Sequence, residues 1–404
     1  MEATHERDPR VNPPRSILYL ISCYSSVNTG HGGHYYSLRE TVRTLNDEWG
    51  DTQINVLAIG DVFPEALQDT TTDIHFINVK QHGILGALRR ALALSKSLQP
   101  SHVHSFDDKA HFIGRVIAAR RGAKSYYTKP GGPNPKSYYP FAPDIVFFSE
   151  ENKTHYSESR KLSRSRLHLI PQRGSAPITD MSRTAELKEL IEQRLVVMRI
   201  CRIGLFYRRS AVQTVALARR LKNEGHDAVA LIIGTVQDEE TYRELREISG
   251  TDALILTDPH FTRNASELLS LATIVVGTGR SLIEAALADR IVLAMLNNSE
   301  LPVLVTNQNW RKLGRRNFSE RSELPRADQC SIDDIARAIH NDDRSGARAV
   351  AAAYNIRSAV PSYLALYSVA QPRHYKPLDL IQNFLIVLKP YLRTRLASVK
   401  ASSS

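Results

Sequence analysis

The sequence contains few cysteines, and they form no spaced pair. Its three cysteines among 404 residues are Cys23, Cys201 and Cys330, which lie far apart without a Cys-x-x-Cys motif. Two of them lie in apolar, strand-like runs, where a buried free thiol is the ordinary state. A disulfide-stapled secreted domain is therefore disfavoured, and a reducing, cytoplasmic compartment is predicted.

Long apolar runs are also missing. No stretch approaches the ~20 apolar residues that a membrane-spanning helix needs. Residues 1–15 are polar and contain proline, with no apolar stretch after a basic start, so we expect a disordered tail and no signal peptide. The sequence therefore predicts a protein that does not span a membrane.

The sequence also lacks side chains at the spacings typical of metal ligands. His, Asp and Glu do not recur with metal-ligand spacing, and Asp107 and Asp108 are adjacent rather than separated as in an Asp-x-Asp motif. We therefore predict that the protein uses neither a metal ion nor a resident cofactor.

Positive charge, by contrast, is abundant. The chain has 53 Lys and Arg against 42 Asp and Glu, a formal net charge of +11. Such an excess attracts nucleic acid, anionic lipid head groups or a nucleoside diphosphate. The local clusters at 160–166, 311–316 and 389–395 are typical of solvated faces. No RNP-like aromatic strand or zinc-finger spacing accompanies them, so we do not expect nucleic acid to be a partner.

Short, β-rich apolar runs alternate with helix-like stretches twice along the chain, which indicates two α/β domains with parallel sheets. The first domain covers residues 16–176, and a polar linker with a charged helix covers 177–194. The second domain covers 195–360, and C-terminal helices cover 361–404. In the second domain we expect strands at 195–201, 228–234, 253–256, 273–277 and 291–295, and helices at 211–223, 238–248, 264–271 and 281–288.

Ligands of doubly wound sheets bind where the strands end, so the loops after strands are the candidate sites. The loop at 28–34 places Gly32 and Gly33 before a helix, where backbone amides can receive an anion. It does not match G-x-G-x-x-G, and a tight turn without a ligand is the alternative.

The loop at 277–285 is the most informative segment of the sequence. Gly279, Arg280 and Ser281 open a helix directly after a buried strand, where phosphate oxygens would receive amide hydrogen bonds. Glu284, about one turn further, could accept hydrogen bonds from ribose hydroxyls. The alternative is a capping box, with Ser281 as the N-cap and Glu284 as its partner.

Two further groups of side chains follow strands. Arg199, Arg202, Arg208 and Arg209 surround the first strand of the second domain and the loop into its helix, where cations would neutralise a diphosphate, unless they are ordinary surface arginines. His104 and Asp107 end a strand of the first domain and could orient a sugar hydroxyl. A structural histidine is equally compatible with the pattern.

Together these segments resemble the glycosyltransferase family 4-like group of enzymes. GHGGHYYSL is similar to the family's N-terminal glycine loop and VHSF to its mid-domain histidine, while APDIVFFSEEN and HLIPQRG are similar to the segments before its linker. RICRIGLFYRRSAVQTVALARRL resembles the segment whose Arg and Lys hold the donor diphosphate. GTGRSLIEAALADRIVLA resembles the Glu-rich donor motif.

The resemblance implies a GT-B fold, in which two Rossmann-like domains face a cleft, and a sugar transfer from a nucleotide-diphosphate donor in glycan or polysaccharide synthesis. It implies that His104 lies beside the donor sugar, that Arg202 with Arg208 or Arg209 binds the diphosphate, and that Glu284 contacts the ribose. Retention of configuration and independence from metals are implied as well. The first Glu of the paired-Glu motif is missing, with Val276 near its place, and Arg replaces the usual Lys.

Two other functions fit the same fold. A nucleotide-sugar 2-epimerase would place a carboxylate base and a histidine in the cleft, and a degenerate subunit would bind a nucleotide or a partner without catalysis. The acceptor would be a glycan or a lipid-linked molecule. The stretch at 378–396 mixes Leu, Ile and Phe with Lys389, Arg393 and Arg395, so it either packs back on the first domain or contacts the inner face of a membrane peripherally.

Overall fold

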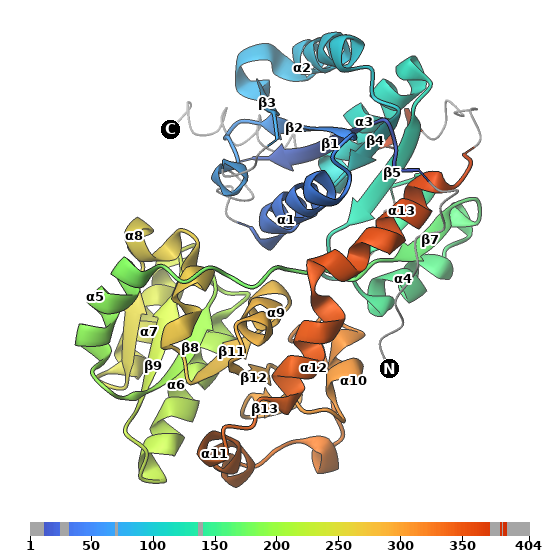
Figure 1. Ribbon diagram of the computed structural model, residues 1–404. Coiled ribbons are helices and arrows are strands. Elements are labelled where there is room, and N and C mark those ends of the chain that lie inside the picture. Colours follow the sequence, from blue (N-terminus) through green and yellow to red (C-terminus); the bar gives the residue numbers. More distant parts are fainter. Residues whose placement is uncertain are drawn as a thin grey trace. The chain divides into compact units, whose positions relative to one another are not determined.

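The computed structural model describes residues 12–24, 32–68, 72–135, 140–371, 380–381 and 383–385. The chain forms two compact units (Figure 1). Unit 1 comprises Met1–Pro171 with Ile356–Ser404, and unit 2 comprises Gln172–Asn355. The segment 177–194, which we expected to be a separate linker, belongs to unit 2. Of the expected N-terminal tail, residues 1–11 lie outside the described residues.

Unit 1 is built on a seven-stranded parallel sheet in the order β3-β2-β1-β4-β5-β6-β7. The strands are β1 (Ser16–Cys23), β2 (Gln53–Gly60), β3 (Ile74–Asn78), β4 (His102–Ser105), β5 (Lys124–Lys129), β6 (Asp144–Phe147) and β7 (Arg166–Leu169). The helices are α1 (Gly33–Glu48), α2 (Val79–Leu98), α3 (Asp108–Arg121), α4 (Glu150–Ser157) and α13 (Val360–Ser368), with short 3-10 turns at η1 (Glu65–Leu67), η2 (Arg160–Leu162) and η5 (Ile356–Ala359).

Burial on both faces of the sheet explains why its central strand is apolar throughout. In β1, Ile17, Tyr19 and Ile21 contact the cluster that includes α1 and α13, whereas Leu18 and Leu20 contact the cluster under α2 and α3. Successive side chains of a strand point to opposite faces, so a strand covered by helices on both sides needs apolar residues at every position.

Unit 2 is built on a six-stranded sheet in the order β10-β9-β8-β11-β12-β13. Its strands are β8 (Leu195–Ile200), β9 (Ala228–Ile233), β10 (Ala253–Leu256), β11 (Ile274–Gly277), β12 (Ile291–Ala294) and the antiparallel β13 (Val303–Leu304). Its helices are α5 (Met181–Ile191), α6 (Arg208–Asn223), α7 (Glu239–Ser249), α8 (Pro259–Thr262), α9 (Arg280–Leu287), α10 (Trp310–Gly314), α11 (Ile332–His340) and α12 (Ser345–Tyr354), with a 3-10 turn at η4 (Arg326–Asp328).

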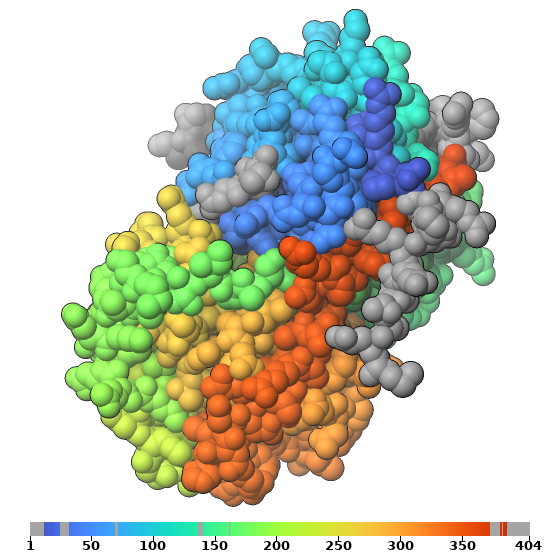
Figure 2. Space-filling view, viewed as in Figure 1, coloured from blue at the N-terminus to red at the C-terminus, as the bar shows by residue number. Residues whose placement is uncertain are grey.

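One expected helix of unit 2 has a different form. Residues 264–271, expected to be α-helical, form the 3-10 helix η3 (Ala265–Leu271). Its N-cap, Asn264, adopts a left-handed conformation, and the amide of Glu267 donates to the carbonyl of Asn264 three residues earlier, as in a 3-10 helix. Figure 2 shows α5, in green, and α12, in orange-red, on the surface of unit 2.

The chain returns to unit 1 after residue 355. Asn383 is buried and its amide group bonds both the backbone amide and the carbonyl of Phe141, each at 3.1 Å. The ring of Phe384 lies 5.2 Å from that of Phe112 on α3. These residues of the stretch 378–396 pack against unit 1, and most of that stretch lies outside the described residues. Within the described part of the chain, no helix is long and apolar enough to cross a membrane.

A network of buried hydroxyl and imidazole groups attaches α13 to the sheet of unit 1. The Tyr367 hydroxyl lies 2.7 Å from the Tyr19 hydroxyl and 2.7 Å from Nδ1 of His104. Nε2 of His104 lies 2.7 Å from the hydroxyl of Thr128. Burial lowers the pKa of His104 to about 3, so this network holds a neutral imidazole.

We expect unit 1 to lose stability as the pH falls from 7 to 5. The folded state keeps His104 neutral, whereas the unfolded state binds a proton near the ordinary pKa of 6.5. At pH 5 this histidine is protonated in the unfolded chain but not in the folded one, which lowers the free energy of unfolding by about 2 kcal/mol relative to pH 7. Urea unfolding at both pH values should show that His104→Gln reduces the loss by about this amount. Equal losses in wild type and His104→Gln would contradict the prediction.

Candidate functional site

The strand order of unit 2 places a topological switch point between β8 and β11. β8 is followed by α6 on one face of the sheet, and β11 is followed by α9 on the other. The loops that leave such neighbouring strands in opposite directions open a crevice at the carboxyl edge, where the parallel strands end. The loop 201–207 after β8 and residues 278–279 after β11 meet there.

Arg199 connects these two strand ends. It is the last but one residue of β8 and 0% exposed, although it is an arginine. Its guanidinium donates to the Val276 carbonyl at the end of β11, to the Thr278 hydroxyl at 3.1 Å and to the Ser281 hydroxyl at 3.2 Å. It also donates to Ser210 on α6 and faces the ring of Tyr207. Among the described residues, none of its hydrogen-bond partners is a carboxylate, so its positive charge is not neutralised by an ion pair.

The loop between β11 and α9 is shaped by backbone conformation and by Ser281. Gly279 is the N-cap of α9, with φ 52° and ψ −121°, a conformation that is essentially restricted to glycine. The hydroxyl of Ser281 accepts from the amide of Thr278 and donates to the Thr278 carbonyl. The amide groups at the start of α9 therefore lie beside the Arg199 guanidinium.

The capping-box alternative for this loop is wrong. Gly279, not Ser281, is the N-cap, and no side chain caps the helix. Glu284 instead pairs with Arg280 one turn away, at 2.6 Å. Both side chains are mostly buried, which makes this i,i+4 pair stronger than an exposed one.

The three predicted arginines of the loop after β8 differ in their surroundings. Arg202 stacks on the ring of Tyr207, 5.3 Å from its centre, and donates to the Tyr207 hydroxyl. Arg208 is exposed and forms an ion pair with Glu244 on α7. Arg209 donates to the carbonyls of Asn297 and Ser299, after β12. Arg202 is thus the one of the three whose contacts all lie within the loop.

The predicted residues of unit 1 have structural contacts. His104 is 0% exposed and both of its ring nitrogens are occupied, so it cannot contact a ligand in this structure. Asp107 is the buried N-cap of α3 and accepts from the amides of Lys109 and Ala110 and from Ser22. Burial raises the pKa of Asp107 to about 6, against the effect of these hydrogen bonds. The contacts of His104 and Asp107 in this structure are thus intramolecular, and a role of either residue beside the sugar stays a prediction.

The predicted glycines of unit 1 lie at a helix start. Gly32 is the N-cap of α1 and Gly33 its first residue, and no side chain caps this helix. The rest of the expected loop, residues 28–31, lies outside the described residues. Among the described residues, no group of three or more His, Cys, Asp or Glu side chains is arranged so that it could hold a metal ion.

No protein-family model matches the chain, and neither does any curated protein sequence. Solved structures do match. HepE of Anabaena in complex with UDP and glucose shares 13% identity, with a TM-score of 0.61 over 87% of this chain and 100% of that one. A glycosyltransferase from Rickettsia africae shares 15%, with a TM-score of 0.59 over 87% and 98%. The UDP-GlcNAc 2-epimerase from Neisseria meningitidis bound to UDP-GlcNAc shares 10%, with a TM-score of 0.53 over 87% and 99%.

The chain has the GT-B fold. Within this fold, HepE has also been solved with UDP-glucose, with a TM-score of 0.62 and 13% identity over 88% of this chain and 100% of that one. At these identities the likeness shows the fold alone.

Two features of the candidate site were missed in the sequence, whereas Arg199 was among the arginines expected at this strand end. Thr278 was passed over between two glycines. The segment 317–322 gave no signal, since only the folded chain brings it to Gly279, whose amide donates to the carbonyl of Phe318 at 3.3 Å.

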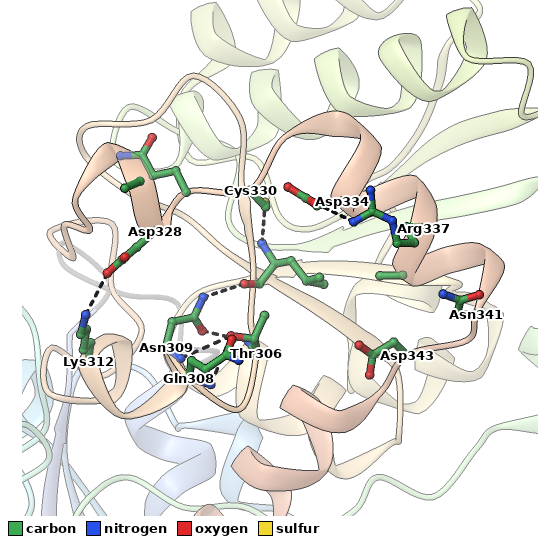
Figure 3. A pocket seen from close by; sticks show the side chains of 14 residues that line it. Thr306, Gln308, Asn309, Lys312, Asp328, Cys330, Asp334, Arg337, Asn341 and Asp343 are labelled. Carbon is green, nitrogen blue, oxygen red and sulfur yellow. Dashed lines mark hydrogen bonds and ion pairs between the residues drawn. The ribbon is translucent and has the colours of Figure 1, made fainter.

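A pocket of about 470 Å³ lies elsewhere in unit 2 (Figure 3). It is lined by the ion pairs Lys312–Asp328 and Arg337–Asp334 and by Thr306. Because β13 runs antiparallel to β12, the residues after Leu304 lead to the amino edge of the sheet. The pocket therefore lies at the opposite edge from the switch point and is not part of the candidate site.

We expect Gly279→Ala to destabilise unit 2 by about 1–3 kcal/mol, because alanine resists this backbone conformation. Gly250 has nearly the same conformation, φ 50° and ψ −124°, at the end of α7, and a Cβ there would meet nothing within 4 Å. Gly250→Ala should lose a similar amount in urea unfolding. Hydrogen exchange should accelerate at residues 277–284 and 315–322 only in Gly279→Ala, and equal acceleration in both variants would contradict a local role of Gly279.

Proposed function

We propose that the chain is a glycosyltransferase that transfers a sugar from a nucleoside-diphosphate sugar to an acceptor hydroxyl. The observation that carries the proposal is the un-neutralised guanidinium of Arg199 at the switch point of unit 2, beside the first amides of α9. A buried cation without a carboxylate partner favours an anion nearby, and a helix start supplies hydrogen bonds to it.

The proposed donor diphosphate lies between the loops after β8 and β11. Arg199 positions Thr278 and Ser281 through its hydrogen bonds, and Thr278, which accepts from Arg199, can turn its hydroxyl hydrogen toward the phosphate oxygens. Arg202 contributes a second charge from the loop after β8. These groups stabilise the negative charge that develops as the diphosphate leaves, and the arrangement costs no reorganisation during the reaction.

One predicted contact changes in this proposal, and one is kept. Arg208 is held by Glu244 on the exposed side of α6, so we assign it no direct contact with the donor. Glu284 remains the proposed ribose contact, and its pairing with Arg280 fixes the side chain in one position. Because both side chains are largely shielded from water, a hydrogen bond that the Glu284 carboxylate accepts from the ribose is stronger than one at an exposed site.

The solved GT-B structures support the kind of donor, because HepE binds UDP and UDP-glucose. Within our proposal, the reaction retains configuration without a metal, and the acceptor is a glycan or a lipid-linked molecule in polysaccharide synthesis. A nucleotide-sugar 2-epimerase is the second candidate, since two such enzymes share the fold. Incubation of nucleotide sugars without an acceptor distinguishes the two, because only an epimerase converts the donor into its epimer.

The first test is donor binding and turnover by the full chain. We expect calorimetry to detect binding of at least one of UDP-, GDP- and ADP-glucose, and mixtures with oligosaccharide or lipid-linked acceptors to release the diphosphate. Binding without any turnover across the acceptors would favour a non-catalytic subunit. Absence of binding to all three nucleotide sugars would contradict the proposal.

We expect Arg199→Met to weaken binding of the nucleoside diphosphate by about tenfold to hundredfold, because it removes a charge from a low-dielectric site. The control is Arg344→Met at the amino edge of unit 2, which removes an arginine bound to Asp289. Calorimetric titration should show unchanged affinity in this control. An affinity in Arg199→Met equal to that of the wild type would remove the observation on which the function rests.

Arg202 and Glu284 should also matter more than Arg208. We expect Arg202→Ala and Glu284→Ala each to reduce donor affinity by about tenfold, since each removes a charge-assisted contact. Arg208→Ala should change it less than about twofold because this arginine is engaged with Glu244 on the surface. A larger loss in Arg208→Ala than in Arg202→Ala, measured by the same titration, would reverse the assignment.

A further inference from the structure

The segment 317–322, between α10 and η4, crosses the carboxyl edge of the unit 2 sheet. The carbonyl of Phe318 accepts from Gly279, which follows β11, and the carbonyl of Ser322 accepts from Asn297, which follows β12. The side-chain amide of Asn317 donates to Gln172 at 3.0 Å. Residues 317–322 are therefore fixed next to the proposed diphosphate site, although they lie about 40 positions further along the chain.

The backbone of this segment is strained. Asn317 and Phe318 are consecutive residues with φ of 53° and 50°. Asparagine adopts this conformation more readily than most residues, but for a bulky phenylalanine it is an outlier that costs free energy. The buried ring of Phe318 packs into the core of unit 2, which holds the segment in place despite this cost.

The same segment concentrates buried polar oxygens that lack a partner. These are Oδ1 of Asn317, Oγ of Ser319, Oε1 of Glu320 and Oγ of Ser322, none of which has a hydrogen-bond partner among the described residues. Ser322 is 2% exposed, so solvent does not satisfy it. Each such atom costs about 1–3 kcal/mol when it is left unsatisfied, and four within six residues are more than a folded protein ordinarily keeps.

The chemistry of these oxygens indicates what they would bind. The carboxylate and amide oxygens only accept hydrogen bonds, and the two hydroxyls can both accept and donate. A phosphate, which also only accepts, does not complement them, whereas the hydroxyl groups of a sugar do. Burial raises the pKa of the Cys201 thiol, and the carboxylate of Glu320 raises it further, so Glu320 lies near the end of β8. The hydrogen bond between Gly279 and Phe318 places the same segment at the end of β11.

We propose that residues 317–322 bind the hydroxyl groups of the donor sugar, with Glu320 as the main acceptor, while Arg202 and the start of α9, next to the buried charge of Arg199, hold the diphosphate. The inference rests on the proposed function and adds the residues that recognise the hydroxyl groups of the donor sugar. Glu320 then supplies from another loop the carboxylate that the paired-Glu motif lacks at Val276.

The test compares a nucleotide sugar with its own diphosphate. Calorimetry measures the affinity of full-length wild type, Glu320→Gln and Ser319→Ala for UDP-glucose and UDP, and for the GDP and ADP pairs. We expect Glu320→Gln to weaken binding of the nucleotide sugar by about tenfold and to change that of the diphosphate less than about twofold. Glu323→Gln, which alters an exposed residue just beyond the segment, is the matched control and should leave both affinities unchanged.

The outcomes separate this inference from the proposed function. Wild type that binds no diphosphate and no nucleotide sugar would overturn both. Wild type that binds both ligands, with Glu320→Gln and Ser319→Ala unchanged for each, would overturn only the sugar-binding role. An equal loss for diphosphate and nucleotide sugar in Glu320→Gln would also overturn it, because the segment would then act on the phosphate site or on folding. Melting temperatures within a few degrees of wild type would show that the variants are folded.

Discussion

The structure of the candidate site depends on one buried charge. Arg199 is enclosed between β8, β11 and α6, and its guanidinium satisfies all of its donors with the carbonyl of Val276 and the hydroxyls of Ser210, Thr278 and Ser281. Burial of a guanidinium is costly unless it is fully hydrogen-bonded. This requirement couples the loop after β11 to the helix after β8 and gives the switch point a fixed positive charge.

The other groups of the site are arranged around this charge in layers of different chemistry. Cationic and amide groups lie at the ends of β8 and β11, whereas the segment 317–322 beyond them offers mostly acceptors. A nucleotide sugar has the complementary order, with a phosphate that accepts hydrogen bonds next to a sugar that donates them. The donors of the strand ends would thus face the phosphate, and the acceptors of the segment 317–322 would face the sugar, which connects the geometry of unit 2 with the proposed transfer reaction.

The buried polar groups of unit 1 have structural contacts. Its buried polar groups, among them His104, Tyr19 and Tyr367, are neutral and mutually hydrogen-bonded, and they attach the returning helix α13 to the sheet. Asp107 likewise joins the start of α3 to β1 through Ser22. Polar residues at strand ends are thus not always ligand contacts, because a chain that returns to its first unit needs specific polar attachments in the core.

The sequence by itself determined the alternating α/β pattern, since continuous apolar runs mark strands that are buried on both faces and Gly279 marks a helix start that only glycine can form. It also located the loop 277–285, because glycine, hydroxyl and basic residues follow one another there locally. Only the tertiary structure decided which polar residues are exposed to a ligand. It buried His104, engaged Arg208 with Glu244, and brought Arg199 and Glu320 to the same strand ends. These outcomes depend on contacts between residues 36 or more positions apart, and local patterns of sequence carry no information about them.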